Sequence, residues 1–261
     1  MNAVEKIVEF LSFEIERPKS FGVFHISCTV ICIGILMFLC LRKEKDHDKT
    51  LKRILLVYGF SALVLEVLKQ VTWSFDYSSM SYSWYAAPFQ LCTMPIFVSL
   101  IAAFIKKGKV RDSLFSFLAF FTILGSIATM VYPESCFVKT LLVDIHTMVL
   151  HLGSFIVSVY LIVKGDAKTN YKRLLSGFIV FLICASLAMI LNIIVHNFIT
   201  SETFNMFYIS PYFTSSLPVF DKVYESVPYL VLLLFYLTMV FIGSIFIYLI
   251  SFITKKIRGN K

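Results

Sequence analysis

The chain has 261 residues, of which 58% are apolar and only 15% are charged, and its formal net charge is +8. A soluble domain is nearer half apolar and a quarter charged, so this composition excludes an ordinary soluble protein and predicts one that lies in a membrane. A positive charge suggests nucleic acid in a soluble protein. Here the basic residues cluster in short loops between apolar runs, which is typical of topology control and contact with anionic lipids. We therefore expect membrane lipids, and no nucleic acid, as partners.

The first eighteen residues predict an amphipathic helix on the membrane surface, because Val4, Ile7, Val8, Leu11 and Ile15 recur at helical spacing. Seven apolar runs follow, each long enough to cross a bilayer at about 17–25 residues. They lie at about 21–41, 54–72, 88–105, 113–132, 140–163, 174–198 and 227–254. The predicted fold is all-α: one membrane domain over residues 1–261, a polytopic bundle of about seven transmembrane helices.

The loops between these runs predict the orientation of the chain. Basic residues collect in segments 42–53, 106–111, 164–173 and 255–261, whereas the alternate loops are almost free of them. Because cytoplasmic loops carry the excess of Lys and Arg, the C-terminus is predicted to be cytoplasmic and the N-terminus outside.

Polar residues within the apolar runs gather near one level of the predicted membrane. Counting 1.5 Å per residue from the outer end of each run puts most of them in the outer half. Ionisable groups in a bilayer are costly and usually face a protein interior, so the set predicts a polar pocket open to the extracytoplasmic side. The candidate residues are His25, Glu66, Gln90, Cys92, His146, His151, Asn192 and Asn205.

A thiol and two imidazoles in such a pocket suggest nucleophilic chemistry. An imidazole can take the proton of Cys92 and later protonate a leaving group, and side-chain amides such as Gln90, Asn192 or Asn205 can stabilise an oxyanion. The simpler interpretation is that each histidine only joins helices and that Glu66 pairs with Lys69 on the same helix face.

The two histidines of the fifth run do not suggest a metal centre. His146 and His151 lie five residues apart, about 140° around a helix, so they share no face, and no metal or cofactor is expected. Depth alone puts His146 nearer than His151 to the level of Cys92, and the residues themselves leave open which of the two faces the thiol.

Five short motifs occur in a recognisable order, and they resemble the YwaF family of bacterial integral membrane proteins, relatives of eukaryotic transmembrane protein 164. The motifs are Phe21–His25, Pro88–Cys92, Leu124–Pro133, His151–Gly153 and Asn205–Pro211. The resemblance covers nearly the whole chain and implies a multi-pass protein of a bacterial cell membrane. It departs at Leu150 and Leu152, which flank His151 where the family pattern has glycines.

The resemblance also implies a lipid acyltransferase or hydrolase that uses a Cys/His pair. Carried over by motif, the nucleophile is Cys92 and the base is His151, with His146, His25 and Glu66 as orienting or substrate-contacting groups. Two other interpretations stay open: a non-catalytic binder or carrier of a lipid or small ligand in the same pocket, and a membrane scaffold whose polar groups only join helices.

Overall fold

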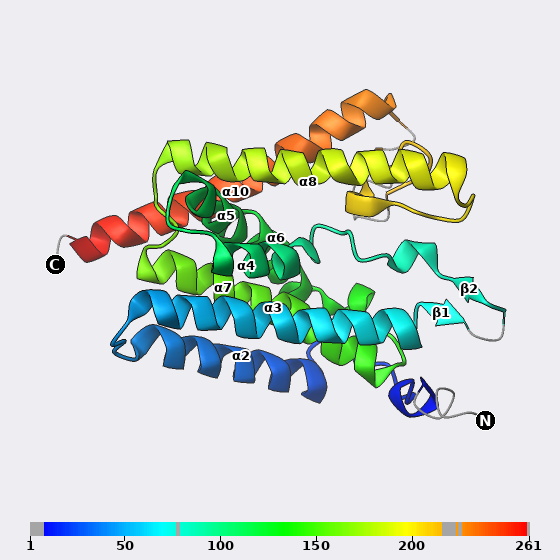
Figure 1. The fold of residues 1–261 in the computed structure, drawn as a ribbon, viewed down its shortest axis with the longest axis horizontal. Helices are drawn as coiled ribbons and strands as arrows, with labels where there is room; N and C mark the ends of the chain where they lie inside the picture. Colours follow the sequence, from blue (N-terminus) through cyan, green and yellow to red (C-terminus); the bar gives the residue numbers. More distant parts are fainter. Residues whose placement is uncertain (1–7, 77–78, 216–222, 224–225, 260–261) are drawn as a thin grey trace.

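The computed structural model describes residues 8–76, 79–215, 223 and 226–259 and shows a bundle of long helices (Figure 1). In the described part of the chain, six helices are long and apolar enough to cross a membrane. The predicted fold class, a polytopic helical membrane bundle, is therefore confirmed. The first described helical residues, 8–11, and the end of the last described helix lie at opposite ends of the bundle in Figure 1.

Five of the spanning helices are continuous, and the sixth is interrupted. The continuous ones are α2 (Val23–Leu41), α3 (His47–Thr72), α7 (Leu141–Lys164), α8 (Tyr171–Phe198) and α10 (Tyr229–Gly259). The interrupted span consists of α5 (Lys109–Phe120) and α6 (Thr122–Val131), which meet at Phe121. Most of these helices differ from the predicted runs by a few residues at each end; α3, which begins at His47 rather than 54, extends furthest into a basic loop.

The run predicted at 88–105 is shorter in the structure. Its helix, α4 (Met94–Phe104), has 11 residues, a length of roughly 16 Å at 1.5 Å per residue, which is about half a bilayer core. Pro95 lies in the first turn of α4. Backbone N–H groups in the first turn have no partner within the helix, so a proline is tolerated in this turn but not further along, and the helix therefore begins just before Pro95. Residues 88–93 precede it as turns, held by two hydrogen bonds between Gln90 and Thr93.

The N-terminal segment forms less helix than its spacing predicts. Residues 8–11 are helical, and the chain then becomes extended, with an isolated bridge between Glu14 and Thr140. Residues 12–18 are therefore not part of the surface helix, because their backbone pairs with the start of α7. The predicted helical positions Val4 and Ile7 lie outside the described residues.

Short elements connect the helices at the end where α7 begins. They are the hairpin β1 (Phe75–Asp76) and β2 (Ser81–Tyr82), and the 3-10 turns η1 (Trp84–Ala86), η2 (Pro133–Cys136) and η3 (Met206–Tyr208). α7 packs against α2, α3, α5 and α6, so it is the central helix of this side of the bundle. Its buried residues include Asp144, His146, His151 and Tyr160.

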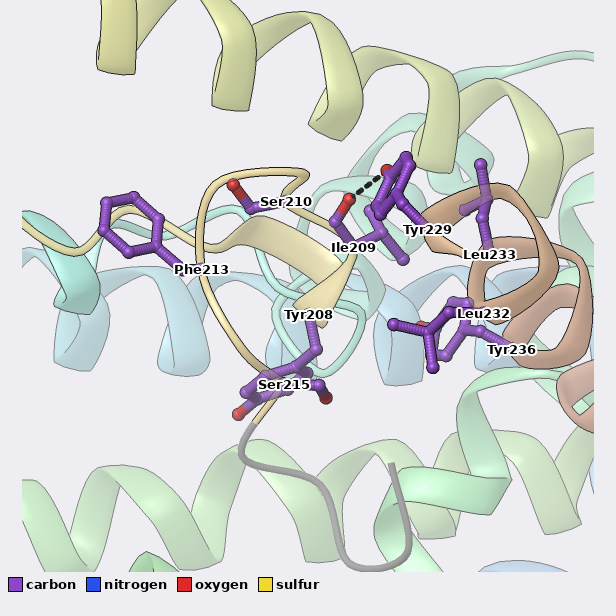
Figure 2. A pocket seen from close by; sticks show the side chains of 9 residues that line it. All are labelled: Tyr208, Ile209, Ser210, Phe213, Ser215, Tyr229, Leu232, Leu233 and Tyr236. Atoms are coloured by element: carbon purple, nitrogen blue, oxygen red, sulfur yellow. Dashed lines mark hydrogen bonds between the residues drawn. The ribbon is translucent and has the colours of Figure 1, made fainter. Parts of the chain in front are cut away.

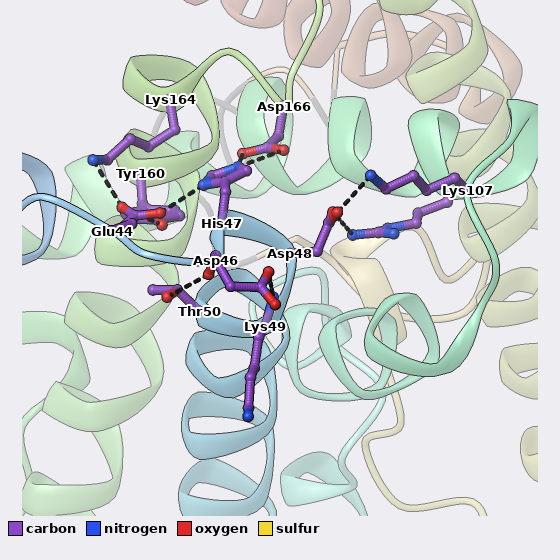
Figure 3. A network of polar contacts seen from close by, with 11 residues as sticks. Glu44, Asp46, His47, Asp48, Lys49, Thr50, Lys107, Tyr160, Lys164 and Asp166 are labelled. Carbon is purple, nitrogen blue, oxygen red and sulfur yellow. Dashed lines mark hydrogen bonds and ion pairs between the residues drawn. The ribbon is translucent and has the colours of Figure 1, made fainter.

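Ion pairs tie the opposite end of the bundle together (Figure 3). The carboxylate of Glu44 contacts Lys164 at 2.8 Å and His47 at 2.7 Å, and His47 also reaches Asp166 at 2.9 Å. Burial alone would raise the pKa of Glu44, but hydrogen bonds from Lys164 and its neighbours outweigh burial and lower the pKa to about 2.

Further ion pairs join the other basic loops at the same end. Asp112 pairs with Lys168 at 2.9 Å and Arg173 at 2.7 Å, and Asp48 pairs with Lys107. The loops after α2, α4 and α7, which the charge pattern predicts on one side of the membrane, thus meet at one end of the bundle.

Candidate functional site

A buried polar network surrounds Glu66 on α3. Its carboxylate contacts Lys69 at 2.7 Å and His146 of α7 at 2.8 Å. The contact with His146 is close but is not aligned as a hydrogen bond. The predicted pairing of Glu66 with Lys69 is confirmed, and the same carboxylate also joins α3 to α7.

The network continues from Glu66 to the loop that carries β2 and η1. Gln70 donates to Glu66 at 2.6 Å and to the carbonyl of Ala86 at 2.8 Å, and Tyr82 donates to the side-chain oxygen of Gln70 at 2.6 Å. Burial, followed by the charge of Glu66, raises the pKa of Tyr82 to about 12, so its hydroxyl remains a donor. The network therefore orders the loop that leads from α3 toward Cys92.

His151 faces a different neighbour, Thr129 on α6. Its Nδ1 lies 3.1 Å from the Thr129 hydroxyl, and that hydroxyl donates its only proton to the carbonyl of Gly125 at 3.0 Å. The roles of the two atoms depend on the ring tautomer: when the hydroxyl proton is on the Gly125 carbonyl, the Thr129 oxygen accepts from Nδ1–H, and the neutral tautomer then has a free lone pair on Nε2. Nε2 has no hydrogen-bond partner in the described part of the chain, and it is not among the fully buried atoms.

Cys92 lies half-buried between Gln90 and the start of α4. Its thiol makes no hydrogen bond to His146 or His151 among the described residues. It does lie within electrostatic range of Cys136, Lys69 and Glu66. The structure thus brings Cys92 to the Glu66 network without bonding it to either imidazole.

Tyr58 of α3 connects the surroundings of Cys92 with those of His151. Its hydroxyl donates to the carbonyl of Leu150 at 3.1 Å, and it lies within electrostatic range of Cys92. Its ring packs on Gly153, where an added Cβ would meet ring atoms at 2.6 Å. Glycine at this position therefore lets Tyr58 lie flat against α7 next to His151.

The three predicted oxyanion donors all bind backbone instead. Asn192 exchanges two hydrogen bonds with Met206, accepting from its N–H at 2.7 Å and donating to its carbonyl at 3.0 Å. Gln90 donates to the carbonyl of Asn205 and accepts from Phe207 N–H. The side chain of Asn205 accepts from Ser210 N–H and donates to the carbonyls at 213 and 214. Together they shape the loop around η3, in which Phe207 has a positive φ of 57°.

A small cavity lies beneath this loop, between η3 and α10 (Figure 2). Its volume is about 10 Å³, room for about one water molecule. The hydroxyl of Tyr229 bonds the carbonyl of Ile209 at 2.6 Å across its edge. Burial raises the pKa of the neighbouring Tyr208 to about 12. The cavity is too small to hold an acyl substrate.

His25 is placed apart from this network. Its ring accepts a hydrogen bond from Phe21 N–H at 3.2 Å and lies 6.1 Å from the ring of Phe137. Phe21 has a positive φ of 58°, so the imidazole holds a strained turn at the start of α2. This contact gives His25 a structural role.

Several residues of the site were not singled out from the sequence. Thr129 orients His151, and Gln70 and Tyr82 extend the Glu66 network. Only Gln70 carried a local signal, since it lies four residues after Glu66 on one helix face. In the described part of the chain, no group of three or more His, Cys, Asp or Glu side chains is arranged to hold a metal ion.

Comparison with known proteins identifies the family. No curated protein and no solved structure matches the chain. A model of the TMEM164 family matches residues 19–253, a range that includes Glu66, Cys92, His146 and His151. The chain is therefore a multi-pass membrane protein that belongs to the TMEM164 family.

Proposed function

We propose that this protein is a membrane-embedded acyltransferase or hydrolase in which Cys92 is the nucleophile and His151 the general base. One observation carries the choice of His151 over His146. The Thr129 hydroxyl lies 3.1 Å from Nδ1 of His151 and 3.0 Å from the carbonyl of Gly125, an arrangement that favours a proton on Nδ1 and a free Nε2, whereas Nε2 of His146 lies against Glu66 at 2.8 Å. A base needs a free lone pair, and His151 has one.

The chemistry follows from these two groups. Nε2 of His151 takes the thiol proton of Cys92, and the thiolate attacks the carbonyl carbon of an acyl ester. A C–S bond forms, the C–O bond breaks, and the imidazolium returns its proton to the leaving alcohol. Water or an acceptor hydroxyl then attacks the thioester, gives its proton to His151, and releases the Cys92 thiol.

The remaining predicted residues support this pair. Glu66, which is within electrostatic range of Cys92, joins α3 to α7 through His146, while Gln90, Asn192 and Asn205 hold the loop around η3. Since Sγ makes no hydrogen bond to the imidazole in the substrate-free chain, the first step requires rotation of the Cys92 side chain or a bridging water.

Acyl labelling of the thiol tests the proposal. The purified full chain is incubated with an alkyne-tagged fatty acyl ester, and thioester-bound label is measured as the fraction released by hydroxylamine. Cys92→Ala should abolish labelling and His151→Gln should lower it by about 100-fold or more, the usual contribution of a general base. Cys184→Ala is the matched control, because this half-buried thiol lies on α8. Equal labelling of the Cys92→Ala and Cys184→Ala proteins would exclude the proposal.

The second candidate is a non-catalytic binder or carrier of a lipid or small ligand. The absence of a hydrogen bond between Cys92 and an imidazole among the described residues favours it. A carrier would keep its ligand after Cys92→Ser and would form no hydroxylamine-sensitive adduct, so the same labelling experiment separates the two functions.

A further inference from the structure

A large groove lies on a face of α3 that does not carry Glu66. It has a volume of about 530 Å³ and lies between α2, α3 and α7, within the range of small-ligand sites. Its walls are almost wholly apolar. They include Ile31 and Ile35 of α2, Ile54 and Val57 of α3, and Leu152 and Ile156 of α7.

The groove exists because of how α2 is packed. α2 and α3 both pack against α7 but hardly contact each other, although Figure 1 shows them running alongside one another. The space between them faces the lipid: Val57 is 67% exposed and Ile31 is 61% exposed. The groove is therefore open from the side to the membrane.

Its polar lining is concentrated at one end, where α2 ends and α3 begins. Arg42, Thr50 and Arg53 line that end. Neither arginine has a carboxylate partner in the described part of the chain, although Arg111 and Arg173 nearby are both paired, with Asp48 and Asp112. The carboxylate nearest to Arg42 in sequence, Glu44, is already bound by Lys164 and His47.

The groove is long enough to hold the acyl chain of one leaflet of a bilayer. Along α2 the lining runs from Arg42 to Cys28, a rise of about 21 Å at 1.5 Å per residue. The hydrocarbon of one leaflet is about 15 Å deep, half of a core of about 30 Å. An acyl chain lying in the groove would thus place its glycerol and phosphate at the level of the two arginines.

We propose that this groove binds an anionic phospholipid, with its acyl chain between α2 and α3 and its phosphate on Arg42 and Arg53. Two guanidinium groups recognise a phosphate through paired charge-assisted hydrogen bonds, and basic pockets between transmembrane helices at the cytoplasmic side bind anionic headgroups. Thr50 lies beside them, and its hydroxyl proton is given to the carbonyl of Asp46. Cys92 and His151 do not line the groove, whereas Tyr58, Leu152 and Gly153 beside them do. The lipid proposal does not depend on the acyl-transfer proposal.

The test measures lipid retention by the purified full chain. The protein in detergent is incubated with phosphatidylglycerol or phosphatidylcholine, and bound lipid is counted by native mass spectrometry. We expect phosphatidylglycerol to be retained at least tenfold better. Arg42→Gln/Arg53→Gln should remove most of that preference, whereas Lys43→Gln/Lys49→Gln, which removes the same charge from exposed residues outside the groove, should keep it.

A second pair of variants tests the apolar part. Ile31→Trp fills the groove, and Val30→Trp adds the same ring to the neighbouring position, which is 62% exposed but does not line it. Only Ile31→Trp should lower retention, by about fivefold or more. Equal retention of both lipids by the unmodified chain, or equal effects within both pairs of variants, would overturn the proposal and leave only non-specific lipid contact.

Discussion

The imidazole of His151 and the hydroxyl of Thr129 lie 3.1 Å apart, and the same hydroxyl reaches the carbonyl of Gly125 at 3.0 Å, an arrangement that favours a proton on Nδ1 of the imidazole. This pair determines which nitrogen of His151 is free. It is the feature on which the proposed chemistry depends most directly.

Replacement of Thr129 tests that relationship. Thr129→Val removes the acceptor and leaves Nδ1–H buried without a partner, which costs about 1–3 kcal/mol, or roughly 5–150-fold in the rate of Cys92 acylation. Thr129→Ser keeps the oxygen and should restore the rate. Single-turnover acylation measures both. A purely structural Thr129 would lower the unfolding temperature of the valine variant without changing the acylation rate of the folded fraction.

Removal of Glu66 should strongly destabilise the bundle. Its side chain is 3% exposed and contacts both Lys69 and His146, so Glu66→Ala removes the counter-charge of Lys69 and leaves its ammonium with the carbonyl of Ala86 at 3.4 Å. Breaking a buried ion pair on one side costs about 3–5 kcal/mol. Thermal unfolding in detergent measures the loss. The double variant Glu66→Ala/Lys69→Met should recover part of it, and a double variant no more stable than Glu66→Ala would show that Lys69 is not the stranded charge.

Loss of Asn192 should release the loop around η3. Asn192→Leu leaves the N–H and the carbonyl of Met206 without their partners, and each buried orphan costs about 1–3 kcal/mol. Limited proteolysis should then cut residues 201–215 faster. Ser186→Leu, at an exposed position on the same helix, provides the control, and equal cleavage of both variants would argue against this anchoring role.

An added methyl group at Gly153 should disturb Tyr58. The new Cβ would lie 2.6 Å from the Tyr58 ring, and such overpacking costs about 1–3 kcal/mol of unfolding free energy. Gly34→Ala is the matched control, since nothing lies within 4 Å of a Cβ there. Unfolding temperatures should fall for Gly153→Ala only, and an unchanged value would mean that Tyr58 does not pack on α7 as described.

The Glu44 cluster predicts a pH dependence of stability. The pKa of Glu44 is about 2 in the folded chain, below its ordinary value of 4.5, so its contribution is complete above pH 4.5 and is lost as the pH falls toward 2. Glu44→Gln should therefore be less stable than the unmodified chain at pH 7, and the difference should vanish near pH 2. Glu16→Gln, at a side chain that is 88% exposed, should show little difference at any pH.

The sequence by itself determined the class of this protein and the approximate position of its spanning helices. Apolar run length and loop charge are local properties, because each helix satisfies its own backbone in a membrane whatever its neighbours are. The pairing of Glu66 with Lys69 was predictable for the same reason, since both lie on one helix face.

Only the tertiary structure decided which residues are the hydrogen-bond and ion-pair partners of the polar side chains. His146 and His151 lie on the same helix but point in different directions around it, and their partners Glu66 and Thr129 come from α3 and α6. Likewise, Gln90, Asn192 and Asn205 could be oxyanion donors by residue type, yet their amides bind the loop around η3. The groove beside Arg42 and Arg53 has no sequence signature either, because it results from α2 packing on α7 and hardly touching α3. Contacts between residues 20 to 100 positions apart depend on how helices pack, and hydrophobic periodicity carries no information about them.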